Sequence, residues 1–131
     1  MANEITVTTS IVATKDVVTV SGAKSHSITI QSTLGVLMHN EQIVGNSKES
    51  LATADVSTSD EVVLWLRNMD ASHIVSVWAV SQQPPSFYMR PGETVGPVRV
   101  YGGQISGWSL QSSATTSKVE VILCEAGDPN S

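Results

Sequence analysis

The segment that reads most clearly as a strand is Glu61-Val62-Val63-Leu64-Trp65-Leu66-Arg67. It is rich in β-branched and aromatic residues, which pack well on a pleated surface. It ends at Asn68-Met69-Asp70, whose short polar side chains suit a turn. The next apolar run, His73 to Val80, is expected to return as its antiparallel partner. This part of the chain therefore predicts a β-hairpin in an all-β protein.

Alternation of apolar and polar residues with a period of two recurs on both sides of this segment. Towards the N-terminus, Ile5–Thr8 and Val18–Val20 are expected as strands on either side of a turn at Lys15-Asp16, with a break at Ser21–Lys24. Other strands are expected at residues 27–32, 34–38, 42–45, 86–89, 97–101, 105–110 and 118–124. This spacing favours an antiparallel β-sandwich or jelly-roll-like barrel of about eight to ten short strands.

Two connections between these strands have contrasting character. Arg90-Pro91-Gly92-Glu93 places Pro and Gly at the central positions of a type II turn. Residues 46–60 are the least strand-like part of the chain, and a single helical turn or an ordered loop fits them equally well.

The length of 131 residues predicts one domain with one continuous core. We expect this domain to span residues 1–125, with an N-terminal arm of about residues 1–14 that is available to pair with a neighbour. Residues 126–131 are expected to form a flexible tail.

The composition argues against several partners. Charged residues make up only 15% of the chain, the net charge is −5, and the seven basic residues are dispersed, so direct nucleic-acid binding is not expected. No apolar run approaches the length of a membrane span, and the N-terminus lacks the pattern of a signal peptide. Cys124 is the only cysteine, which excludes an intrachain disulfide and fits assembly in a reducing cytoplasm.

Residues suited to catalysis or metal binding do not form a recognisable motif. His26 and His39 are isolated in the sequence, and the grouping of His73 with Asp70 and Ser72 is explained by the turn. The chain lacks a nucleophile elbow and a zinc-protease motif. Its carboxylates do not follow the spacing of a calcium loop, and Cys124 follows an apolar run that favours a buried, inert thiol. We therefore expect no enzymatic activity, no cofactor and no metal site.

The three tryptophans leave a carbohydrate-binding module as an alternative, because exposed rings can stack on sugars. Trp65 and Trp78 lie within apolar strands and are expected to be largely buried. Trp108, between Gly107 and Ser109, is expected to be the most exposed. Core or inter-subunit packing is the favoured interpretation for all three.

Several short motifs resemble those of a family of small bacteriophage virion proteins. The chain opens with Met-Ala-Asn-Glu-Ile-Thr at residues 1–6, and a Gly-x-Ser-x-Glu-x-Leu pattern follows at Gly45, Ser47, Glu49 and Leu51. An Asp-Val-Ser-Thr loop follows at residues 55–58, then Leu-Arg-Asn-Met-Asp at residues 66–70 and Pro-Gly-Glu at residues 91–93. The resemblance covers most of the chain and rests on strands and turns.

What the resemblance implies is a non-enzymatic β-sandwich that decorates or cements an icosahedral head. The implied partners are the major capsid protein and further copies of the chain, as a homotrimer on the head surface of the virion. A tail, neck or head-fibre component is the alternative within the virion. The candidate interface residues are Ile5, Val7, Ser47, Glu49, Leu51, Phe87, Tyr88 and Trp108.

Overall fold

The computed structural model describes residues 4–29, 37–53, 56, 61–80, 83–100 and 104–127. Within these residues it contains ten strands, one short 3-10 helix and no α-helix. The strands are β1 (Glu4–Lys15), β2 (Val18–Thr29), β3 (Leu37–Gly45), β4 (Glu49–Ser50), β5 (Glu61–Asn68), β6 (Val75–Trp78), β7 (Phe87–Met89), β8 (Thr94–Val100), β9 (Ser109–Ser112) and β10 (Thr116–Gly127). The helix η1 spans Ile105–Gly107. The all-β fold predicted from the sequence is thus confirmed.

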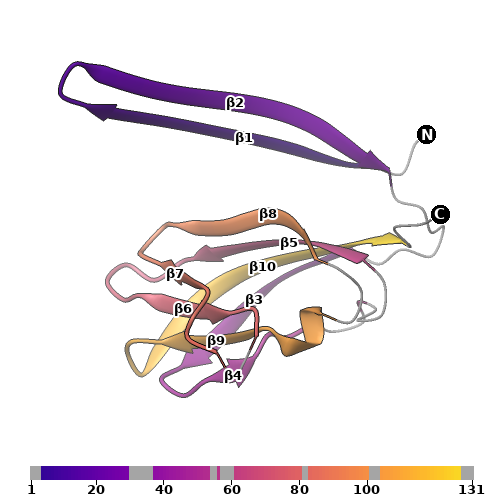
Figure 1. Cartoon of the computed structure of the whole chain (residues 1–131). Coiled ribbons are helices and arrows are strands. Elements are labelled where there is room, and N and C mark those ends of the chain that lie inside the picture. The colour runs from indigo at the N-terminus through magenta and orange to yellow at the C-terminus, as the bar shows by residue number, and fades with distance from the viewer. Residues whose placement is uncertain are drawn as a thin grey trace.

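The strands form two antiparallel four-stranded sheets and a separate two-stranded ribbon (Figure 1). The long-strand sheet has the order β3-β10-β5-β8, and the short-strand sheet has the order β4-β9-β6-β7. The ribbon consists of β1 and β2 and is called the arm below. The arm lies over the side of the long-strand sheet that faces away from the short-strand sheet (Figure 1).

The core of the sandwich lies between the two sheets. Alternate residues of β5 (Val62, Leu64 and Leu66) are fully buried, as the period of two requires for a strand with one face on the core. The largest side chains with no access to solvent include Leu64, Leu66, Met89, Ile105, Leu110 and Leu123, and they come from both sheets and η1.

The predicted hairpin between residues 61–67 and 73–80 is wrong. β5 pairs with β10 and β8, whereas β6 pairs with β7 and β9 in the other sheet. The connection between β5 and β6 therefore crosses the sandwich. Apolar residues of β5 and β6 therefore face each other across the core from two different sheets, and each strand buries its inner face against the opposite sheet.

The arm also differs from expectation. β1 and β2 pair without interruption from Glu4↔Thr29 to Lys15↔Val18, so the break predicted at Ser21–Lys24 is wrong. The turn predicted at Lys15-Asp16 is confirmed, with Asp16 in the left-handed region at φ 55°. Cross-strand pairing satisfies the backbone around Gly22, and the space beside that glycine is occupied by Ile11 on the opposite strand.

Other local predictions have mixed outcomes. The turn at residues 90–93 is confirmed by a hydrogen bond of 2.9 Å from Glu93 N–H to the Arg90 carbonyl and by φ of 81° at Gly92. The runs at 34–38 and 42–45 contribute to one strand, β3, with residues 30–36 outside the described part. Residues 105–110 divide into η1 and the start of β9. β10 continues to Gly127, two residues into the expected tail, and residues 128–131 lie outside the described part.

Candidate functional site

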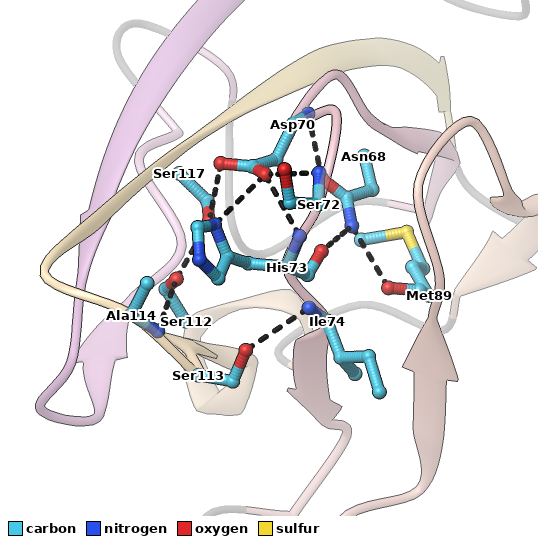
Figure 2. Close-up of polar contacts among 10 residues, drawn as sticks. All are labelled: Asn68, Asp70, Ser72, His73, Ile74, Met89, Ser112, Ser113, Ala114 and Ser117. Atoms are coloured by element: carbon cyan, nitrogen blue, oxygen red, sulfur yellow. Dashed lines mark hydrogen bonds and ion pairs between the residues drawn. The ribbon is translucent and has the colours of Figure 1, made fainter.

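A cluster of polar side chains is built on the loop between β5 and β6 (Figure 2). Asp70 Oδ1 accepts hydrogen bonds from the backbone N–H groups of Ser72 and His73, both at 2.8 Å, and lies 3.0 Å from His73 Nδ1. Its other oxygen accepts a bond from the Ser117 hydroxyl at 3.1 Å. The loop sequence Asp-Ala-Ser-His thus folds around a single carboxylate, as Asp does at turns.

These hydrogen bonds stabilise the charged form of the carboxylate. The Ser72 N–H, and then the His73 N–H and the Ser117 and His73 side chains, lower the pKa of Asp70 from 3.8 to about 2 against the opposing effect of desolvation. Asp70 is therefore an anion at neutral pH. It holds the loop between β5 and β6 in one conformation, because it accepts hydrogen bonds from several donors at once.

The same cluster has the residue types of a serine hydrolase but a different connectivity. The Ser117 hydroxyl points to Asp70, and its other neighbour is the Ser112 hydroxyl at 2.6 Å. Nucleophilic catalysis uses a hydrogen bond from the serine to the histidine, with the carboxylate behind the histidine. Here both Ser117 and His73 contact the carboxylate directly, so the cluster acts as a structural clasp.

Asn68 joins this clasp to the opposite sheet. Its buried side-chain amide donates to the carbonyl oxygens of His73 and Met89 at 2.8 and 2.9 Å, and its side-chain oxygen accepts from Asp70 N–H at 2.9 Å. The Asn68 backbone also accepts a bond from Gly92 N–H and donates one to the Glu93 carbonyl. The turn at residues 90–93 and the end of β5 are therefore tied together.

A second candidate site lies between the arm and the outer face of the long-strand sheet. Val7 of β1 is buried against Val63 and Cys124. Next to this contact is a cleft of about 260 Å³. Its floor is an apolar surface made of Val63, Trp65, Pro97, Ile122 and Cys124, and Thr6, Val7 and Thr8 of the arm line its other side.

The side chains that line this cleft are suited to packing against apolar groups. Burial raises the pKa of the Cys124 thiol, which keeps it in the unreactive protonated form at neutral pH. Within the residues that line the cleft, the polar side-chain groups are the threonine hydroxyls, the indole N–H of Trp65 and the thiol, and none of them is charged at neutral pH. Such a surface can bury apolar side chains but offers no charged group to orient a polar substrate.

The distal part of the arm exposes aliphatic side chains to solvent. Ile11 is 68% exposed, Val12 is 70% exposed, and Val17 in the turn is 98% exposed. Residues 4–29 carry only two acidic and two basic residues, which are Glu4, Lys15, Asp16 and Lys24. The arm is thus an extended element with exposed apolar residues and few charges, which is typical of an interaction surface.

The residues proposed from the sequence as an interface do not form one surface. Val7 is buried between the arm and the long-strand sheet, and Ile5 pairs with Ile28 within the arm. Phe87 and Tyr88 are exposed on β7, at the edge of the short-strand sheet. Of the 45–51 segment, Ser47 is exposed, Glu49 accepts a bond from the Gln42 side chain, and Leu51 is buried in the core.

The exposure expected for Trp108 is wrong. This side chain is only 5% exposed and stacks on Phe87 with a distance of 6.1 Å between ring centroids. η1 turns the chain so that Trp108 enters the core instead of solvent, a change that flanking Gly and Ser residues do not reveal. Trp78 is buried as expected, with the Lys48 ammonium 4.5 Å from its ring centroid.

The sequence pattern did not single out Trp65 as a residue of the cleft or Ile11 as an exposed residue of the arm. Trp65 was expected to be largely buried, but it is half-buried and lines the cleft. Ile11 is one of the exposed residues, and its signal is present in the sequence. Val7, Ile11 and Ala13 are separated by even numbers of residues in one long strand and so share a face.

The described part of the chain holds neither a cluster of metal ligands nor a membrane-spanning helix. No group of three or more His, Cys, Asp or Glu side chains there is arranged to hold a metal ion. No helix in that part of the chain has the length and hydrophobicity to span a membrane. In comparisons with known proteins, the chain matches no family model, no curated protein and no solved structure.

Proposed function

We propose that this chain is a non-enzymatic structural protein of a bacteriophage virion, and specifically a capsid decoration protein that binds the major capsid protein. The single observation that carries an assembly role is the arm, which presents the exposed aliphatic residues Ile11, Val12 and Val17 on a ribbon beyond the sandwich. Isolated two-stranded ribbons are marginally stable in water. An arm of this kind gains stability when a neighbour covers it.

The phage setting is supported by the motifs on which the sequence resemblance rests. Leu66–Asp70 closes β5 and begins the polar clasp, and Pro91–Glu93 is the turn hydrogen-bonded to Asn68. These motifs contact each other and position the two sheets. The motifs therefore have structural roles, and such roles are expected in a family whose members assemble through their surfaces.

The carbohydrate-binding alternative is weakened by the burial of Trp78 and Trp108. Trp65 faces the cleft below the arm, and no row of exposed tryptophan rings is found in the described part of the chain. A glycan-binding platform needs such rings at the surface.

Purified chain mixed with undecorated phage heads tests the proposal. The chain is expected to co-sediment with heads, to saturate at a fixed number of copies per head, and to raise the temperature at which the heads rupture. Isolated tails and a glycan panel serve as parallel samples. Binding to tails with none to heads would replace the decoration role by a tail or neck role, and binding to neither would refute a virion role.

A further inference from the structure

A surface cavity of about 430 Å³ lies beside the clasp around Asp70. Its lining comes from residues 69–71 of the loop between β5 and β6, from Ile43 of β3 and from residues 116–118 of β10. The cavity is at the end of the long-strand sheet, because the pairing of β10 with β5 begins only at Val119. Loop residues 69–71 thus stand where a continued β5 would lie.

Asp70 gives this cavity a fixed negative charge. Its carboxylate is only 16% exposed and is held in place by the loop's backbone N–H groups. Oδ1 is near three donors, whereas Oδ2 accepts one hydrogen bond from the described residues, that of the Ser117 hydroxyl. Each carboxylate oxygen has two lone pairs, so Oδ2 can accept a further donor.

The chain's own basic side chains do not neutralise this charge in the described part. The group paired with Asp70 there is the His73 imidazole, and neither a lysine nor an arginine. Lys118 lines the cavity, but its ammonium is 3.2 Å from the Glu41 carboxylate. Glu41 lies opposite Glu120 in the strand register, so this ion pair draws the ammonium along β10 away from Ser117. The cavity therefore keeps the negative charge of Asp70.

Apolar side chains stand beside this charge. Ile43 is 57% exposed and Met69 is 37% exposed, and both line the same cavity as Asp70. A ligand that satisfies the whole cavity has an aliphatic stem and a cationic head, as arginine and lysine side chains do. Arginine fits better, because its guanidinium is less strongly hydrated and carries several donors in one plane. Those donors can serve Asp70 and the Thr116 hydroxyl together.

We propose that this cavity receives an arginine side chain of a partner protein, with the guanidinium on Asp70 and the aliphatic stem on Ile43 and Met69. Charge complementarity favours a basic partner surface, since the chain has a net charge of −5. The identity of the partner rests on the proposed function, which makes it the major capsid protein. The cavity itself does not depend on that function.

Titration with N-acetyl-arginine methylamide, followed by NMR of the backbone amides, tests the cavity. Saturable shifts are expected at residues 69–71 and 116–118, with a dissociation constant in the millimolar range. The citrulline analogue has nearly the same shape without the charge and should bind at least about threefold more weakly. Shifts that do not saturate, or equal binding of the citrulline analogue, would refute the site. A lysine analogue that binds as tightly as the arginine analogue would overturn the assignment to arginine.

Two variants locate the binding. Ala71→Trp fills the cavity from an exposed position and retains every hydrogen bond of Asp70, so it should weaken arginine binding by at least about tenfold. Gln83→Trp adds the same ring at an exposed position beyond the other end of β6 and should change nothing. Asp70→Asn should abolish the preference for arginine over citrulline. Circular dichroism checks that each variant is folded, and a folded Ala71→Trp chain that binds like the wild type would contradict the proposal.

Co-sedimentation with undecorated heads separates this inference from the proposed function. Ala71→Trp is expected to weaken head binding by at least about tenfold, and Gln83→Trp to leave it unchanged. Heads that bind the wild type and Ala71→Trp equally would refute the cavity as the capsid contact and leave the decoration role standing. A chain that binds the arginine analogue but ignores heads would refute the decoration role and leave the cavity standing.

Discussion

The side-chain amide of Asn68 donates a hydrogen bond of 2.9 Å to the backbone carbonyl of Met89 (Figure 2). Asn68 ends β5 in the long-strand sheet, and Met89 ends β7 in the short-strand sheet. One buried side chain thus links the two layers of the sandwich. Its other hydrogen bonds, to His73 and Asp70, shape the loop that carries the chain from one layer to the other.

Replacing Asn68 by alanine is expected to lower the free energy of unfolding by about 2–4 kcal/mol. The substitution leaves the carbonyls of His73 and Met89 without their donor inside the protein, and each unsatisfied group is costly. Urea denaturation of the purified chain measures the change. Ser72→Ala is the control in the same loop, since it keeps the backbone N–H that bonds to Asp70, and it should change stability by less than about 0.5 kcal/mol.

Asp70 should contribute to the acid sensitivity of the fold. Its native pKa of about 2 lies below the ordinary value of 3.8, so the ionised group stabilises the fold above pH 3.8. That stabilisation is lost as the pH falls through about 2. The difference in melting temperature between the wild type and Asp70→Asn is therefore expected to be constant above pH 5 and to shrink between pH 4 and 2. A difference that stays constant across this acid range would contradict the network in Figure 2.

Trp108→Ala is expected to destabilise the chain by about 3–5 kcal/mol, because it removes a large buried ring and its stacking with Phe87. Chemical denaturation followed by circular dichroism measures this loss. Tyr88→Ala is the comparison, since that ring is exposed on the edge strand β7, next to Phe87 in the sequence, and should affect stability little. Equal stability of the two variants would mean that Trp108 is not a core residue.

Gly96→Ala is expected to be more harmful than Gly92→Ala, although both glycines have positive φ. A Cβ at position 96 would lie 2.4 Å from the Leu64 carbonyl oxygen, whereas a Cβ at position 92 would meet open space. We expect a loss above about 2 kcal/mol for the first, and about 1 kcal/mol, from backbone strain alone, for the second. Thermal melting of both variants gives the comparison, and the reverse order would contradict the close approach of Gly96 to the Leu64 backbone.

Much of the local structure was predictable because its causes are local. β5 follows from an apolar run that contains the strand-favouring residues Val62, Val63 and Trp65. The turn at 90–93 follows from Pro91 and Gly92, and the arm's turn follows from Asp16, which tolerates positive φ. The aliphatic residues of the arm were also visible in the alternation of residues 4–15. The exposure of these residues could not be predicted, because an alternating pattern identifies one face of a strand but does not show whether another layer of the protein covers that face.

The sequence by itself determined that this chain forms strands, where several of them turn, and that it contains neither a nucleophile-elbow nor a zinc-protease motif. The tertiary structure alone decided which strands become neighbours. β10 lies between β3 and β5, and β5 and β6 separate into different sheets, because pairing is chosen by the total apolar area buried across the core. The same long-range choice buries Trp108 and leaves Ile11 in solvent, since burial depends on what packs above a residue and not on its sequence neighbours.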